Sequence, residues 1–199
     1  MSKHIRREIT ALKKEILALG AAVEEILYKA MKSLEERDRS LAEEVMQEDT
    51  AIDQMEVEIE EDCLKVLALH QPVAIDLRLI IAILKINNDL ERVGDLAVNI
   101  AERSVFLATK EKVAIPADFK KMSEISRDML TKSLDALVTE DSALAYKVCG
   151  MDDAVDAINS EMYTLIQDEI KKDPSKMEAL IHLLSVSRHL ERIADLATN

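Results

Sequence analysis

The chain has 199 residues and a formal net charge of −13, and 48% of its residues are apolar although only two Phe, three Tyr and no Trp are present. This charge argues against a nucleic-acid ligand and disfavours contact with an anionic membrane, because both would need Lys and Arg opposite phosphates. Three Gly and three Pro leave few positions for turns, and most other residues are helix formers. The expected fold class is therefore all-α.

The chain shows no sign of a membrane span or a secretion signal. No apolar run approaches the roughly 20 residues of a membrane span, and the N-terminus lacks the apolar stretch of a signal peptide. Cys63 and Cys149 have no CxxC spacing and fall beside apolar residues at helical spacing. We therefore expect a cytoplasmic protein in which both cysteines are core residues and not redox or metal groups.

Apolar residues at three-and-four spacing predict three helices in the first half of the chain. The first covers residues 5–36, and the polar break 37–40 separates it from a second helix that ends near Pro72. Asp76 is the expected N-cap of a third helix, which continues to about Thr109.

The second half repeats this plan after a linker at residues 110–117. Helices are expected over 118–138, from about Ser142 to a stop before Asp173, and from about Ser175 onward, with Pro174 at the first position of the last helix. Residues 90–99 align with 190–199 at an offset of 100, with seven of ten identical, and 49–53 align with 152–156. The repeat predicts two tandem three-helix bundles related by internal duplication, residues 1–112 and 113–199.

The repeated element, Leu-Glu-Arg-x-x-Asp, places carboxylates four residues apart, so that they project from one face of a helix. Further pairs at the same spacing occur on each preceding helix. Like charges at this spacing repel, and a hard or borderline cation held by oxygen ligands would neutralise them. Together with two asparagines one turn further along, the predicted ligands of two equivalent metal sites are Asp49, Asp53, Glu91, Asp95, Asn99, Asp152, Asp156, Glu191, Asp195 and Asn199.

Other interpretations of these carboxylates stay open at this point. A single Glu-x-x-x-Asp pair is usually a solvated helix face, but these pairs recur in both halves while neighbouring residues differ. Arg92 and Arg192 lie inside the element and could neutralise the carboxylates instead of a metal. A di-iron bundle needs Glu-x-x-His motifs, which are absent, and His182 and His189 are interpreted as ordinary helix residues. No residue pattern argues for catalysis.

The segment 90–95 followed by Asn99 and Ile100, with its near copy at 190–199, resembles the duplicated signature of the PhoU family. Met55-Glu56 after Asp53 and Gln71-Pro72 before Asp76 are similar to it as well. The resemblance covers essentially the whole chain. It implies two three-helix bundles packed side by side, often in a homodimer.

In function, the resemblance implies a cytoplasmic, non-enzymatic negative regulator of phosphate uptake and of the phosphate regulon. Such proteins link the ATPase of a phosphate ABC transporter to a sensor histidine kinase, so the chain would be peripheral to the membrane only through protein partners. The resemblance also implies iron or zinc, in multinuclear clusters, at the motif carboxylates. One departure is that the last helix stops at Asn199 in mid-pattern, so the second repeat is expected to be cut short.

Two alternatives to this function remain from the residues alone. The first is a metal-free structural or scaffold protein whose repeated element builds Arg–carboxylate networks. The second is a carboxylate-bridged metalloenzyme, which lacks the usual histidine ligands.

Overall fold

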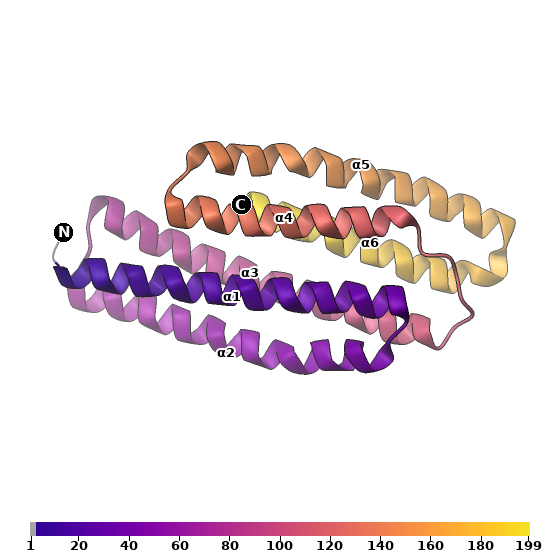
Figure 1. The fold of residues 1–199 in the computed structure, drawn as a ribbon, viewed down its shortest axis with the longest axis horizontal. Helices are drawn as coiled ribbons and strands as arrows, with labels where there is room; N and C mark the ends of the chain where they lie inside the picture. Colours follow the sequence, from indigo (N-terminus) through magenta and orange to yellow (C-terminus); the bar gives the residue numbers. More distant parts are fainter. Residues whose placement is uncertain (1–2) are drawn as a thin grey trace.

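The computed structural model describes residues 3–199, and this part of the chain is all-helical, as predicted. The first bundle contains α1 (Lys3–Glu36), α2 (Arg39–His70) and α3 (Ala74–Ala108). The second contains α4 (Ala117–Thr139), α5 (Ser142–Lys172) and α6 (Met177–Thr198), with a 3-10 turn at Pro174–Lys176 before α6. Figure 1 shows the two bundles side by side, with α3 and α6 behind α1 and α4.

Local polar residues determine where several helices begin. The Asp38 carboxylate accepts a hydrogen bond from the Leu41 N–H at 3.1 Å, and the Asp141 carboxylate caps α5 in the same way. The prediction for Asp76 was wrong, because α3 begins two residues earlier, with Val73 as its N-cap residue. Asp76 instead lies in the first turn of α3, where a negative charge interacts favourably with the helix dipole.

The core follows the apolar stripes of the helices. On α1, the apolar residues with at most 1% of their surface exposed recur at the predicted spacing: Leu12, Ile16, Leu19, Val23, Leu27, Ala30 and Leu34. Cys63 is buried among such residues on α2, as predicted. The prediction for Cys149 was wrong, because it is exposed. Only one face of α5 packs on α4 and α6, and Cys149 lies one residue past the buried Val148, about 100° around the helix.

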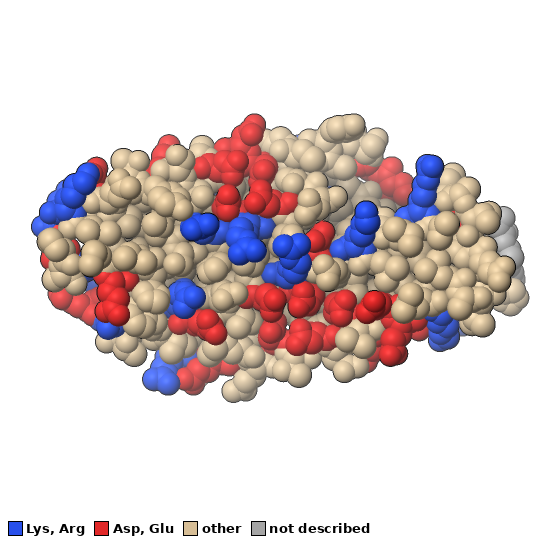
Figure 2. Space-filling view, turned by 180° about the vertical axis from the view of Figure 1, so that it is seen from behind, with Lys and Arg blue, Asp and Glu red and all other residues tan. Residues whose placement is uncertain are grey.

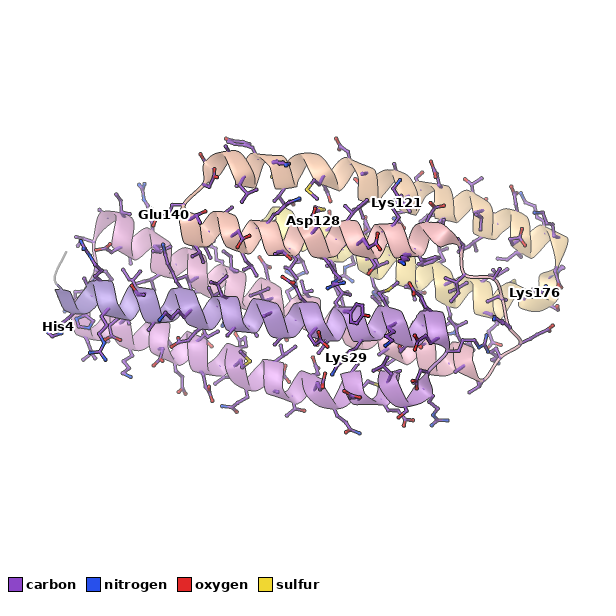
Figure 3. The ribbon with its side chains drawn as sticks, in the orientation of Figure 1. His4, Lys29, Lys121, Asp128, Glu140 and Lys176 are labelled. Carbon is purple, nitrogen blue, oxygen red and sulfur yellow. The ribbon has the colours of Figure 1, made fainter. Side chains whose placement is uncertain are left out.

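Two helix pairs, α3 with α6 and α1 with α4, join the bundles. A Cβ atom on Gly20 would collide with the Leu134 side chain, so glycine permits the close approach of α1 and α4. The Lys13 ammonium on α1 lies 3.0 Å from the carboxylate of Glu140, which Figure 3 shows at one end of α4. Between α3 and α6, the rings of Phe106 and His182 stack with centroids 3.8 Å apart.

Arg37 connects the first interhelical turn to the end of α3. It follows α1 in the left-handed region, at φ 56°, and its guanidinium donates to the carbonyl oxygens of Leu107 at 2.7 Å and Lys110 at 2.6 Å. The carbonyls at a helix C-terminus lack intrahelical partners and carry partial negative charge. The charged side chain therefore stabilises the point where the chain leaves the first bundle.

We expect Arg37→Ala to lower the free energy of unfolding by about 2 kcal/mol, because the partly buried carbonyl oxygens of Leu107 and Lys110 lose a charged hydrogen-bond donor. Urea unfolding followed by circular dichroism measures this change. The control is Arg39→Ala, which removes an exposed pair with Glu43 at 2.7 Å and should change stability by less than about 0.5 kcal/mol. Equal effects of the two substitutions would contradict a special role for Arg37.

Candidate functional site

Two carboxylate pairs meet where α2 packs on α3. Asp49 and Asp53 come from α2, and Glu91 and Asp95 from α3, and we call these four residues the first acidic site. Burial, followed by the charges of Asp53 and Asp95, raises the pKa of Asp49 to about 6. Burial and then the charges of Asp95 and Asp53 also raise the pKa of Glu91. The structure thus brings these predicted residues together across two helices.

Gly94 sets the distance between the two helices at this point. A Cβ atom there would lie 3.3 Å from Cγ2 of Ile52 and 3.4 Å from a carboxylate oxygen of Asp49. The Asp49 carboxylate therefore rests against the backbone of α3, where its access to water is reduced. The loss of hydration explains why burial is the largest cause of its raised pKa.

The arginines of the repeated element do not neutralise these carboxylates. Arg92 is exposed, and its guanidinium lies 3.5 Å from Asp89, one turn before it on α3. Within residues 3–199, no Lys, Arg or His lies within ion-pair distance of a carboxylate of the first acidic site. The predicted alternative of an Arg–carboxylate network is therefore not formed at the first acidic site.

The second acidic site is the equivalent set on α5 and α6: Asp152, Asp156, Glu191 and Asp195. Burial, then the charges of Asp156 and Asp195, raises the pKa of Asp152, and one of its carboxylate oxygens is buried without a hydrogen-bond partner. Burial also raises the pKa of Glu191, although the positive charge of Arg188 lowers it in part. Figure 2 shows acidic side chains in two groups on the face that α3 and α6 present, with a band of Lys and Arg between them.

A fifth carboxylate, which is not among the predicted ligands, lies beside the first site. The Glu56 carboxylate accepts a hydrogen bond from the buried Asn87 amide at 3.2 Å, and burial followed by the charges of Glu60 and Asp53 raises its pKa. The repeat places Asn159 at the position of Glu56 and Ser187 at that of Asn87. There the Ser187 hydroxyl donates to the Asn159 side-chain oxygen at 2.7 Å.

At this position the first site therefore has a carboxylate where the second has a neutral amide. A comparison of the repeats could have pointed to Glu56. Its aligned partner, Asn159, is uncharged, and the two residues that donate to these side chains, Asn87 and Ser187, lie one turn before the repeated element in each half.

Asn99 and Asn199 lie at a different place from the α2 and α5 carboxylates. With Arg92, Arg192 and Asp95, among others, they line a cleft of about 280 Å³ between α3 and α6. The side-chain amide of Asn99 donates to the backbone oxygen of Asp95 at 2.8 Å. Their role as additional metal contacts stays a prediction.

The residues of both sites suit a hard or borderline cation in type, because carboxylate oxygens without cationic partners need a counter-charge. In the structure, however, the carboxylates of each site do not converge on one point. Among the described residues, no three His, Cys, Asp or Glu side chains form a cluster ready to hold an ion. An ion would therefore have to draw the Asp53 and Asp95 side chains, which are exposed and free to rotate, toward Asp49 and Glu91.

The two histidines of α6 take no part in the acidic sites. His182 stacks on Phe106, and both ring nitrogens of His189 are buried without a hydrogen-bond partner. Burial, then the nearby charge of Arg103, lowers the pKa of His189 to about 4. The ring is therefore neutral at physiological pH and contributes to the packing between α3 and α6.

The raised pKa of Asp49 predicts a pH-dependent effect on stability. A folded-state pKa of about 6, above the usual 3.8, means that the folded state binds the proton more tightly. Stability therefore falls as the pH rises from about 4 through 6, and the charge destabilises the fold at pH 7.

Asp49→Asn should then raise the free energy of unfolding at pH 7 by about 1 kcal/mol, after allowance for solvent screening, and should have little effect at pH 4. Urea unfolding at both pH values, in the presence of a chelator, measures this. The exposed Glu161→Gln on α5 is the control and should have little effect at either pH. The same gain for Asp49→Asn at both pH values would show that its charge is not responsible.

Comparison with known proteins identifies the family. The PhoU domain model matches two segments of the chain, residues 16–104 and 119–199. A phosphate-specific transport system accessory protein PhoU homolog from Aquifex aeolicus is 39% identical over 94% of this chain and 84% of its own length. The homolog from Clostridium acetobutylicum is 36% identical over 99% of this chain and 90% of its own length.

Solved structures have the same fold. The crystal structure of PhoU from Pseudomonas aeruginosa superposes with a TM-score of 0.93 at 33% identity and covers 98% of this chain and 93% of that one. The phosphate transport system regulatory protein PhoU from Streptococcus pneumoniae gives a TM-score of 0.88 at 30% identity, over 98% and 92% of the two chains. Both halves of the sequence match the domain and the whole fold matches these structures, so the chain belongs to the PhoU family.

Proposed function

We propose that this protein is a cytoplasmic accessory regulator of a phosphate-specific transport system, which restrains phosphate uptake and phosphate-regulon signalling when phosphate is plentiful. The observation that carries the proposal is the family match through both repeats, with relatives named as accessory proteins of phosphate-specific transport. None of the helices in the described part of the chain is long and apolar enough to cross a membrane.

In this proposal the protein acts without catalysis, as an adaptor. It contacts the ATPase of the phosphate ABC transporter and a sensor histidine kinase, and it works as a homodimer. The long helical faces support such a role, because they present a large rigid surface to protein partners. The acidic side chains of that surface would complement basic patches on a partner.

Deletion of the gene should raise the output of a phosphate-starvation reporter in the presence of high phosphate, because the restraint on signalling is lost. Reporter activity in the deletion strain and in a strain complemented with the wild-type gene measures this. An unchanged reporter in high phosphate would remove the regulatory role, whatever the protein binds.

We further propose that the two acidic sites bind metal ions, iron or zinc, in multinuclear form. What supports this is the set of partly buried carboxylates that form no ion pair within the described chain, together with the partnerless oxygen of Asp152. The first site has the additional carboxylate of Glu56 where the second has Asn159, so the first should hold the ion more tightly. The pairing of Arg92 with Asp89 argues against the metal-free scaffold.

The metal proposal predicts different losses for the two sites after growth with iron. Asp49→Asn with Glu91→Gln should remove the more tightly held ion, and Asp152→Asn with Glu191→Gln the weaker one, as measured by elemental analysis after dialysis. Retention at the first site should fall as the pH drops through about 6, because protons then compete for Asp49. The exposed pair Glu124→Gln with Glu161→Gln is the matched control and should retain all of the metal.

Wild-type protein with no metal above background, and with the same stability in chelator, would contradict this proposal. The reporter experiment would still test regulation, so the two parts of the proposed function can fail separately.

A further inference from the structure

One end of the molecule differs in charge from the rest. Figure 1 places the start of α1, the end of α2 and the start of α3 together at this end, and Figure 3 labels His4 there. Glu8 and Lys65 line one small cleft, which fixes the antiparallel register of α1 and α2. Residues 3–8 of α1 therefore lie at the level of residues 65–79, and we call these two segments the α2–α3 end.

The charge of the α2–α3 end is opposite to that of the whole protein. Its two segments contain five Lys and Arg but only Glu8 and Asp76 as acidic residues, within a chain of formal charge −13. Arg6, Arg7 and Arg78 are exposed and have no ion-pair partner within residues 3–199. A positive region of this kind attracts anionic surfaces over about 8–10 Å at physiological ionic strength.

The tip of the α2–α3 end is apolar and exposed. Leu69, Val73 and Ile75 have 69%, 74% and 73% of their surface accessible, more than most large hydrophobic side chains of the protein. They lie on both sides of the turn at Gln71 and Pro72, which carries no charge. Figure 2, seen from behind, shows the right-hand end of the molecule, where this turn lies, mostly free of charged side chains.

We propose that the α2–α3 end docks on an anionic lipid bilayer, with Leu69, Val73 and Ile75 entering the interface and Arg6, Arg7 and Arg78 contacting lipid phosphates. Apolar side chains surrounded by Lys and Arg are typical of segments that bind the surface of a membrane. Leu77, which is 39% exposed, extends the patch formed by these side chains along α3. They include no aromatic residue, the type most enriched at protein interfaces.

The acidic remainder of the protein does not prevent contact in an end-on orientation. At 1.5 Å per residue, the nearest acidic residues of α2 outside this end, Glu61 and Asp62, lie about 14–15 Å from Gln71, and the acidic-site residues Asp53 and Glu91 lie about 25 Å from the α2–α3 turn. The first distance exceeds one Debye length and the second exceeds two, so the repulsion of an anionic surface is weakened for the first pair and largely screened for the second. A molecule lying flat would instead bring its acidic faces to the surface. The docked molecule therefore stands with its helices along the membrane normal.

Flotation with vesicles tests the proposal. The wild-type protein should float with vesicles that contain phosphatidylglycerol and not with vesicles of phosphatidylcholine alone, and high salt should release it. Arg6→Glu with Arg7→Glu, and separately Val73→Asp with Ile75→Asp, should each lower the partition coefficient by about tenfold or more. Met177→Asp with Ile181→Asp changes two half-exposed apolar residues at the opposite end of the molecule and should leave flotation unchanged.

A spectroscopic measurement locates the contact. The chain has no Trp, so Ile75→Trp introduces a single reporter whose fluorescence should shift to the blue and be quenched by brominated lipid. Ile181→Trp should do neither. Circular dichroism confirms that each variant is folded.

Three results would overturn the proposal. The first is equal flotation with both kinds of vesicle, and the second is no flotation at all. The third is a wild-type dimer in sedimentation that Val73→Asp with Ile75→Asp dissociates, because the α2–α3 end would then be an interface between two copies of this chain.

Discussion

Helix α3 packs against three other helices, and this crowding decides where its polar side chains lie. It contacts α1 and α2 within its own bundle and α6 in the other, so most of its circumference must be apolar. A polar side chain that faces a neighbour must find a partner there, since an unpaired buried polar group is destabilising. Asn87 finds Glu56 on α2, whereas Glu91 and Asp95 face other carboxylates and remain uncompensated. The side-chain oxygen of Asn87 and the hydroxyl of Ser104 are also buried without a hydrogen-bond partner, but both groups are neutral, so the acidic site is the place where α3 carries uncompensated charge.

The second repeat shows which parts of this arrangement are adjustable. Glu56 and Asn87 correspond to Asn159 and Ser187, so both partners differ while a hydrogen bond between α5 and α6 is kept. Gly94, which lets Asp49 approach the backbone, corresponds to Ala194. The four carboxylate residues of each site are identical in the two repeats. The packing has therefore been adjusted around a carboxylate set that is itself destabilising, and this contrast is the physical reason to assign the set a role beyond folding.

Most of the fold followed from the sequence because helix period and turn residues are local signals. The predicted limits near Glu36, His70 and Asp173 agree with the structure, and the carboxylate pairs of α2 and α3 do meet. The predicted start of α3 was wrong because an aspartate is favourable both as an N-cap and within the first turn of a helix, where Asp76 lies. The exposure of Cys149 and the turn of Arg92 toward Asp89 depend on which neighbours cover each face, and periodicity in one helix does not contain that information.

The net charge of the whole chain likewise does not reveal the local charge of one of its ends. A formal charge of −13 makes an anionic membrane an unfavourable partner only if the charge acts as a whole. In an elongated bundle it does not, because screening limits each charge to about one Debye length while a helix of 34 residues extends about 50 Å. The acidic sites near the middle of the molecule and the basic α2–α3 end would thus act on different partners. The same separation would let one protein hold cations in its grooves while its end contacts lipid phosphates, with little interference between the two.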